Sequence, residues 1–236
     1  TTIENAAIEP EITDLSHFLN SMGAEILGAG TDTIKINGVK ELSGAEHRVI
    51  PDRIEAGTYM VAAAACHGQV TVNNIICEHL KPIIAKLRES GVEIIENYHS
   101  VTVNATEPFK PIDLKTLPYP GFPTDMQAQF SSYLSGIPGT SIVTETIFEN
   151  RFMHLGELKR MGANIKTEGR TAVIEGTSLT GAKVKATDLR AGAALVIAGL
   201  HAEGETEISD CQYITRGYYQ FYENLNRLGA NILRID

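Results

Sequence analysis

MGAEI at residues 22–26 recurs three times along the chain, and this repetition decides the fold. The other copies are SGVEI (90–94), MGANI (161–165) and LGANI (228–232), and their glycines are spaced by 68, 71 and 67 residues. Near-constant spacing of this kind is the signature of a protein built from repeated supersecondary units. Each glycine follows an amphipathic run and is expected to end a helix, because glycine adopts the left-handed conformation at little cost.

A helix precedes each repeated glycine and strands follow it. In residues 80–87 the apolar side chains recur at i, i+3, i+4 and i+7, which predicts a helix with one buried face. After the glycines, apolar and polar residues alternate as they do in strands. Two of these segments predict hairpins that turn at 96–97 and near Gly169.

An aspartate precedes a second, earlier helix in three of the units. Asp52, Asp125 and Asp188 lie 39, 37 and 41 residues before the repeated glycines, and each comes before an apolar helical run. Asp is a favoured N-cap residue, so all three predict helix starts. A further strand is expected ahead of each of these helices, at 47–50, 111–117 and 182–186. The repeated unit is therefore βαβαββ.

Three such units, each nearly complete, fill residues 48–236, whereas residues 1–47 supply only the second half of a unit. Half a unit cannot bury its own helix face and needs neighbours that this chain lacks. We therefore expect residues 1–47 to be the C-terminal part of a second, incomplete domain, and the whole chain to be the C-terminal portion of a longer repeat protein. The alternative is that residues 1–47 simply pack on the other three units.

Composition is that of a globular protein and excludes several functional classes. The 236 residues are 43% hydrophobic and 21% charged, with a formal net charge of −9. That charge disfavours non-specific binding to nucleic acid, and no apolar stretch is long enough to predict a transmembrane helix. The first residues do not resemble a signal peptide. The three cysteines are widely spaced and the histidines lack metal-ligand spacing, so we expect a cytoplasmic protein without disulfides or a metal site.

Four groups of motifs are distinctive: IENAAIEPEI (3–12), PDRIEAGT (51–58), GFPTDMQAQF (121–130) with ETIFENRFMH (145–154), and ATDLRAGAALVIAG (186–199) with RGYYQF (216–221). Through these motifs the whole chain resembles the UDP-N-acetylglucosamine 1-carboxyvinyltransferases, a bacterial enolpyruvyl transferase family. The resemblance implies an α/β fold, an inside-out α/β barrel of repeated βαβαββ units with helices inside and sheets outside. One departure is Tyr119, where the family pattern has His.

The resemblance also implies a reaction. The family transfers the enolpyruvyl group of phosphoenolpyruvate to the 3′-hydroxyl of UDP-N-acetylglucosamine and releases phosphate, by addition and then elimination. This is the first committed step of peptidoglycan synthesis, and so serves cell-wall biogenesis, cell shape and cell division. It needs a base, an acid and cations that hold phosphate and carboxylate, but no cofactor and no metal. The expected partners are the two substrates and the missing N-terminal half of the same enzyme, with neither nucleic acid nor membrane among them.

Five residues are site candidates by this resemblance. Asp125 is the candidate general base at the sugar hydroxyl, although its place before a helical run equally predicts an N-cap. Arg216, at the phosphoenolpyruvate site, and Arg190 are the other catalytic candidates, because a guanidinium binds phosphate or carboxylate through paired hydrogen bonds. Asp125, Arg216, Ile147 and Arg151 are the substrate-binding candidates. Ile147 would act through its backbone and also suits a strand core, and Arg151 also suits an ion pair with a neighbouring acid such as Glu149.

The family's N-terminal half carries a Lys-Asn pair and a flexible loop with a catalytic cysteine and an arginine, and none of these has a counterpart here. We expect Cys66, Cys77 and Cys211 to be structural thiols instead. The chain alone is therefore expected to be inactive. Two other functions stay open: a shikimate-pathway enolpyruvyl transferase, and a non-catalytic repeat domain that binds a sugar nucleotide or a partner protein.

Overall fold

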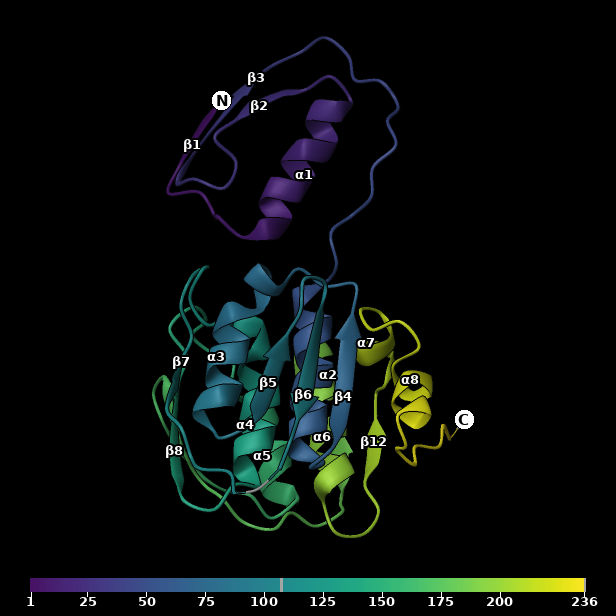
Figure 1. Cartoon of the computed structure of the whole chain (residues 1–236). Helices are drawn as coiled ribbons and strands as arrows, with labels where there is room; N and C mark the ends of the chain where they lie inside the picture. The colour runs from purple at the N-terminus through teal and green to yellow at the C-terminus, as the bar shows by residue number, and fades with distance from the viewer. Residues whose placement is uncertain (107, 236) are drawn as a thin grey trace.

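Three central helices form the middle of the molecule, as the computed structural model shows for residues 1–106 and 108–235 (Figure 1). They are α2 (Arg53–Ala65), α4 (Gln127–Ser135) and α6 (Leu189–His201), and each packs against the other two. Residues at or just before their N-terminal ends line one cavity, and residues at their C-terminal ends line another. The three helices therefore run parallel.

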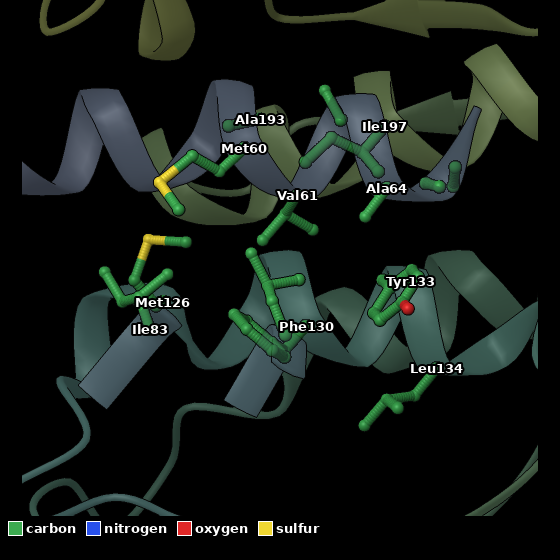
Figure 2. Close-up of a cluster of buried hydrophobic side chains, with 14 of the residues drawn as sticks. Met60, Val61, Ala64, Ile83, Met126, Phe130, Tyr133, Leu134, Ala193 and Ile197 are labelled. Carbon is green, nitrogen blue, oxygen red and sulfur yellow. The ribbon is translucent and has the colours of Figure 1, made fainter. Parts of the chain in front are cut away.

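Their packing surface is mainly apolar, with polar contacts from α4 to α6 through Ser132 and to α2 through Gln129. Figure 2 shows Met60 and Val61 of α2 beside Phe130 of α4 and Ile197 of α6, and all four side chains are fully buried. A helix that is apolar all round, as α2 is, belongs in the interior. Each large side chain buried in this way stabilises the fold by roughly 1.5–3 kcal/mol. Gly57 lets α2 approach its neighbours, because a Cβ there would lie 2.8 Å from the Ile83 side chain.

Two sheets lie outside these helices, and a third sheet with the same strand order lies beside α1 (Pro10–Ser21) in the N-terminal part of the chain (Figure 1). The three comparable sheets are β1 (Thr2–Glu4)–β3 (Thr33–Asn37)–β2 (Glu25–Leu27), β4 (Gln69–Asn73)–β6 (Ser100–Asn104)–β5 (Glu93–Glu96), and β8 (Thr140–Thr144)–β10 (Thr171–Glu175)–β9 (Asn164–Glu168). All their neighbouring strands are antiparallel. Two parallel pairs join β7 (Leu114–Lys115) to β8 and β11 (Lys183–Lys185) to β12 (Glu207–Ser209). Both predicted hairpins, β5–β6 and β9–β10, are confirmed.

The outer helices end as the repeated glycines predict. They are α1 (Pro10–Ser21), α3 (Lys81–Glu89), α5 (Met153–Arg160) and α8 (Phe221–Arg227), and shorter turns are η1 (Cys77–Leu80), η2 (Thr124–Met126) and α7 (Gln212–Thr215). Gly23, Gly91, Gly162 and Gly229 have φ of +101°, +99°, +91° and +104°. In every case the next residue donates its N–H to the carbonyl five positions back along the helix, as Val92 does to Leu87 at 3.0 Å, which is the Schellman arrangement.

Two of the three predicted N-caps are confirmed. The Asp52 carboxylate accepts hydrogen bonds from the N–H groups of the second and third residues of α2, at 2.7 and 3.0 Å, and Asp188 does the same for α6, at 2.9 Å each. The prediction for Asp125 is wrong. The chain first forms the 3₁₀ turn η2, α4 begins at Gln127, and no side chain caps it. The Asp125 carboxylate instead meets two arginines, which offer stronger, charge-assisted hydrogen bonds.

Two predicted strands are absent from the described residues. Residues 47–50 form no strand, and the His47 ring instead stacks on Phe18 at 5.1 Å and bonds Asp14 at 3.0 Å. The segment after Gly229 is also irregular. Asn226 holds both the N–H and the carbonyl of Ile232, at 2.8 Å each, as Asn20 holds Ile26 in β2. The described residues bring no neighbouring strand to this segment, so it forms no ladder. Only the second unit is therefore a complete βαβαββ.

Residues 1–37 form a lobe of their own, in which α1 lies against the sheet β1–β3–β2 (Figure 1). Residues 38–52, without helix or strand, join this N-terminal lobe to α2. Leu15 of α1 is 52% exposed, so the apolar face of this helix is only partly covered. The division of the chain at residue 47 stays a prediction. No described helix combines the length and the apolar character needed to cross a membrane.

The capping difference can be tested by substitution. Asp52→Ala and Asp188→Ala should each lower the free energy of unfolding by about 1 kcal/mol, because each leaves two helix N–H groups without a partner. The matched variants Asp52→Asn and Asp188→Asn should be nearly silent, since Asn caps as well as Asp. Urea denaturation monitored by circular dichroism measures the difference. Equal losses for the Ala and Asn variants would contradict the capping assignment.

His154 of α5 makes stability depend on pH. Burial lowers its pKa to about 4, so the folded protein holds a neutral imidazole. The neutral imidazole contributes fully to the free energy of unfolding above about pH 6.5, the pKa of a histidine in the unfolded chain. This contribution is lost as the pH falls toward 4. Acidification over this range should cost about 3 kcal/mol of unfolding free energy through this residue. His154→Gln should remove that share of the pH dependence, which urea titrations at pH 7 and pH 4.5 would detect as a shallower slope.

Candidate active site

Two adjoining cavities lie between residues 5–18 and the N-terminal ends of the central helices. The first, of about 570 Å³, has Arg190 and Asp125 in its wall. The second, of about 630 Å³, is lined by Ile147 and Phe148 among others. Asp125 and Arg53 line both cavities, and so stand where the two meet.

Two arginines hold the Asp125 carboxylate. Arg151 donates from Nη2 to Oδ1 at 2.7 Å, and Arg190 donates to Oδ2 from Nη2 at 3.0 Å and from Nε at 3.3 Å. Burial raises the pKa of Asp125, but the charges and hydrogen bonds of Arg190 and Arg151 outweigh it and hold that pKa below the ordinary value. Asp125 is therefore ionised at neutral pH. Oδ1 accepts only the bond from Arg151 and so keeps a lone pair that a ligand can use.

A buried network fixes Arg190 from behind. Its Nη1 donates to the Tyr218 hydroxyl at 3.2 Å. The Thr58 hydroxyl donates its only proton to the carbonyl of Ile54 at 2.8 Å. In the 3.0 Å hydrogen bond between the Thr58 and Tyr218 hydroxyls, Tyr218 must therefore be the donor. The Tyr218 oxygen is then an acceptor toward Arg190. Thr58 of α2 and Tyr218, which lies just before α8, therefore together orient Arg190 of α6.

Arg151 lies between β8 and α5 and is held by three different groups. Besides the bond to Asp125, its Nη1 donates to the Thr124 hydroxyl at 2.7 Å, and its guanidinium lies over the Phe148 ring at 4.7 Å. The predicted rival partner, Glu149, faces Arg170 instead at 3.6 Å. Arg151 therefore does pair with an acid, but the acid is the candidate catalytic Asp125.

The structure brings four of the five candidate residues together. Asp125, Arg190 and Ile147 line the two cavities, and Arg151 joins them through its hydrogen bond to Asp125. Ile147 is 38% exposed beside the larger cavity. Arg216 is the exception. It is exposed at the end of α7, borders neither cavity, and has no hydrogen-bond partner among residues 1–106 and 108–235.

Several site residues were not predicted from sequence, chiefly Thr124, Tyr218 and the buried Glu145. Thr124 and Glu145 lie inside the motifs at 121–130 and 145–154, and Tyr218 lies inside RGYYQF. Motif membership was therefore the only signal that could have pointed to them. Tyr218 and Glu145 support the site through hydrogen bonds outside the cavity wall, and no sequence spacing identifies a hydroxyl or carboxyl group in that role.

Charges of both signs line these cavities: in the first, Arg53 and Arg190 stand beside the carboxylates of Glu11, Asp14, Asp52 and Asp125. The N-terminal ends of α2 and α6, which carry the positive ends of the helix dipoles, point toward the first cavity together with Arg190. Arg53 adds a further cation that pairs with Glu11 of α1 at 2.8 Å and lies 5.6 Å from the Tyr119 ring. This pair joins the N-terminal lobe to the wall of the site.

The cysteines lie apart from these cavities. Cys77 and Cys211 donate their thiols to backbone carbonyls, at 3.1 and 3.2 Å. Desolvation raises the pKa of all three thiols, Cys66 included, which keeps them protonated and weakly reactive. Cys66 and Cys211 are exposed and Cys77 is half-buried, so the expected structural role of the three thiols stays a prediction.

Comparison with known proteins decides the family. The profile described as EPSP synthase (3-phosphoshikimate 1-carboxyvinyltransferase) matches residues 1–225. The chain belongs to the carboxyvinyltransferase family. A UDP-N-acetylglucosamine 1-carboxyvinyltransferase 1 of Caldanaerobacter subterraneus is 63% identical to this carboxyvinyltransferase chain over 235 residues, which are 99% of the chain and 57% of that protein. The chain thus spans little more than half the length of such relatives. A protein of the same name from Desulfofundulus thermocisternus is 61% identical over 94% of the chain and 92% of its own length.

Solved structures agree on the fold of this carboxyvinyltransferase chain. The enolpyruvyl transferase NikO from Streptomyces tendae superposes with a TM-score of 0.87 and 27% identity, over 98% of the chain and 56% of NikO. EPSP synthase from Acinetobacter baumannii superposes with a TM-score of 0.75 at 20% identity, over 94% of the chain and 55% of that protein. The predicted enolpyruvyl transferase fold, an inside-out α/β barrel with helices inside and sheets outside, is confirmed.

Proposed function

We propose that this chain is the C-terminal portion of an enzyme that transfers the enolpyruvyl group of phosphoenolpyruvate to the 3′-hydroxyl of UDP-N-acetylglucosamine and releases phosphate. The observation that carries the proposal is the ionised Asp125, held by two arginines where two cavities meet. The relatives that bear this name, at 63% and 61% identity, support the choice of substrate.

Asp125 is the proposed base for the sugar hydroxyl. A base must be unprotonated before it can act, and the two arginines meet that condition at neutral pH. The same arginines weaken its basicity, because they stabilise the charged form. A substrate phosphate or carboxylate that draws Arg190 or Arg151 away returns basicity to Asp125. Binding of the anionic substrate and activation of the base are then linked through the same guanidinium groups.

The other candidates take complementary roles. Arg190 and Arg216 hold the phosphate and carboxylate of phosphoenolpyruvate, and Arg216 is suited to this role because its exposed guanidinium has no partner in the described part of the chain. Arg151 and the backbone of Ile147 contact the sugar nucleotide. The hydroxyl oxygen adds to the central carbon of phosphoenolpyruvate while the methylene gains a proton. Loss of phosphate and of one methyl proton then restores the double bond.

The acid that protonates the methylene belongs, in this proposal, to the N-terminal half of the enzyme. The chain alone is then a binding-competent but inactive part. Its cellular role would be cytoplasmic, in the synthesis of cell-wall precursors and hence in cell shape and division. The domain division follows the same scheme: residues 48–236 carry this part of the active site, and residues 1–47 belong to the second domain.

Binding separates the proposal from a shikimate-pathway enzyme. The 236-residue chain should bind UDP-N-acetylglucosamine saturably in calorimetry and should show no heat with shikimate 3-phosphate at the same concentration. Adding the N-terminal half should then yield phosphate release with phosphoenolpyruvate, which a non-catalytic binding domain would not give. Binding of shikimate 3-phosphate instead of the sugar nucleotide would reject the proposed substrate.

Asp125→Asn tests the base. In the complete enzyme, phosphate release with both substrates saturating should fall by about 10²–10⁴, the usual contribution of a positioned general base. Asn keeps a hydrogen-bond acceptor but cannot take the proton. Asp113→Asn is the matched control, because Asp113 is a surface carboxylate that only accepts from the Ile142 N–H at 3.0 Å. A rate within a few-fold of wild type for Asp125→Asn would remove Asp125 from the chemistry.

A further inference from the structure

Glu145 is a buried acid that the proposed reaction does not use. It follows β8 directly, is 1% exposed, and is not part of the wall of either cavity. No arginine or lysine among the described residues pairs with it. A buried carboxylate without a cationic partner is costly unless several donors satisfy it, so its neighbours show what holds it there.

Four neutral donors surround this carboxylate. Oε1 accepts from the Thr116 hydroxyl at 2.9 Å and from the N–H groups of Ile147 and Phe148 at 2.8 and 3.1 Å. Oε2 accepts only from the Thr124 hydroxyl, at 2.8 Å. Glu145 therefore joins the loop that carries Ile147 to the turn that carries Asp125.

The direction of the Thr124 hydroxyl follows from its two partners. A hydroxyl has one proton, and Arg151 can only donate, so the Thr124 oxygen is the acceptor toward Arg151 at 2.7 Å. Its proton must then point to Glu145 Oε2. A carboxylate is the side chain that can accept there without competing as a donor. The negative charge of Glu145 also polarises the hydroxyl and makes its oxygen a better acceptor for the guanidinium.

Both surfaces that hold Arg151 therefore depend on one acid. Thr124 binds the edge of the guanidinium, the Phe148 ring lies 4.7 Å from its carbon, and Glu145 fixes Thr124 by its side chain and Phe148 by its backbone. Arg151 in turn donates to Asp125 at 2.7 Å. The chain of contacts runs from Glu145 through Arg151 to the carboxylate at the meeting point of the cavities.

We propose that Glu145 is a positioning residue, which orients Arg151 against Asp125 through the Thr124 hydroxyl and the Phe148 backbone and never touches substrate itself. The kinetic part of this inference rests on the proposed function. Its geometric part, the link between Glu145 and the charge state of Asp125, does not.

Glu145→Gln breaks the link at one atom. The amide nitrogen that replaces Oε2 is a donor, so it cannot accept the Thr124 proton, while the remaining oxygen can still hold Ile147 and Phe148. In the complete enzyme kcat should fall about 10- to 100-fold, as expected when a group that orients the base is displaced. The acid limb of the pH–rate profile should move to higher pH, because Asp125 loses part of the positive charge that keeps its pKa low.

Ser141→Ala is the matched structural control. Ser141 lies on β8, the strand that Glu145 follows, is 1% exposed, and accepts the Ile112 N–H at 3.2 Å, but has no bonded path to Arg151. It should lower thermal stability as Glu145→Gln does and leave kcat and the acid limb unchanged. The double variant Glu145→Gln, Thr124→Val should be no slower than Thr124→Val alone. An unchanged kcat and acid limb in Glu145→Gln, or additive losses in the double variant, would overturn the inference.

A measurement on this chain alone separates the two proposals. Carbon-13 NMR titration of the Asp125 carboxyl in the 236-residue chain should give a higher pKa in Glu145→Gln than in wild type, and no change in Ser141→Ala. The charged groups that meet Asp125 are Arg190 of α6 and Arg151, with the Arg53–Glu11 pair across the cavities, and only Arg151 depends on Glu145. If Glu145→Gln fails to fold, Thr124→Val must show the same rise. An unchanged pKa refutes the positioning role, whereas an inactive wild-type enzyme refutes only the proposed reaction.

Discussion

The parallel packing of α2, α4 and α6 is the constraint on which the rest of this structure depends. Because no residue of α2, α4 or α6 is more than partly exposed, these helices must be surrounded, and the sheets and outer helices provide the surrounding layer. Because the helices run in the same direction, their N-terminal ends meet at one place. The interior packing therefore also decides where Asp52, Asp125 and Arg190 come together around one cavity.

The second unit differs from the others at one position, and the difference creates the site. The carboxylates of Asp52 and Asp188 accept hydrogen bonds from N–H groups at the start of α2 and α6. In the second unit α4 starts later, after the η2 turn. Neither the turn nor the helix has a side-chain cap, so no N–H group at their start donates to the Asp125 carboxylate. Its carboxylate is then available to two arginines and, in the proposed reaction, to a substrate hydroxyl. In the proposed reaction, a repeated fold thus gains its base where one unit departs from the common local structure.

Charge at the site is balanced over two shells of residues. Asp125 and Arg190 line the first cavity, Arg151 holds Asp125 from outside its wall, and Tyr218 and Glu145 stand behind the two arginines. The Tyr218 hydroxyl donates its proton to Thr58, so its oxygen accepts from Arg190. The Thr124 hydroxyl donates its proton to Glu145, so its oxygen accepts from Arg151. Both arginines are therefore oriented by hydroxyl groups whose own protons are directed away. This arrangement keeps each guanidinium in place while leaving a lone pair of Asp125 open.

The sequence by itself determined the repeat and the features that act over a few residues. The glycines at 23, 91, 162 and 229 end helices because the local need for a left-handed residue can be read from the preceding helical run. The hairpins and the caps at Asp52 and Asp188 follow for the same reason. Strands at 47–50 and after Gly229 were predicted wrongly, since a strand exists only where a neighbour pairs with it. Tertiary structure alone decided that Asp125 meets two arginines, and that Glu145, 20 residues away in sequence, stands behind them. At Asp125, capping of a helix competes with ion pairs to Arg151 and Arg190, which lie 26 and 65 residues away in sequence. The local sequence around Asp125 contains no information about these distant arginines.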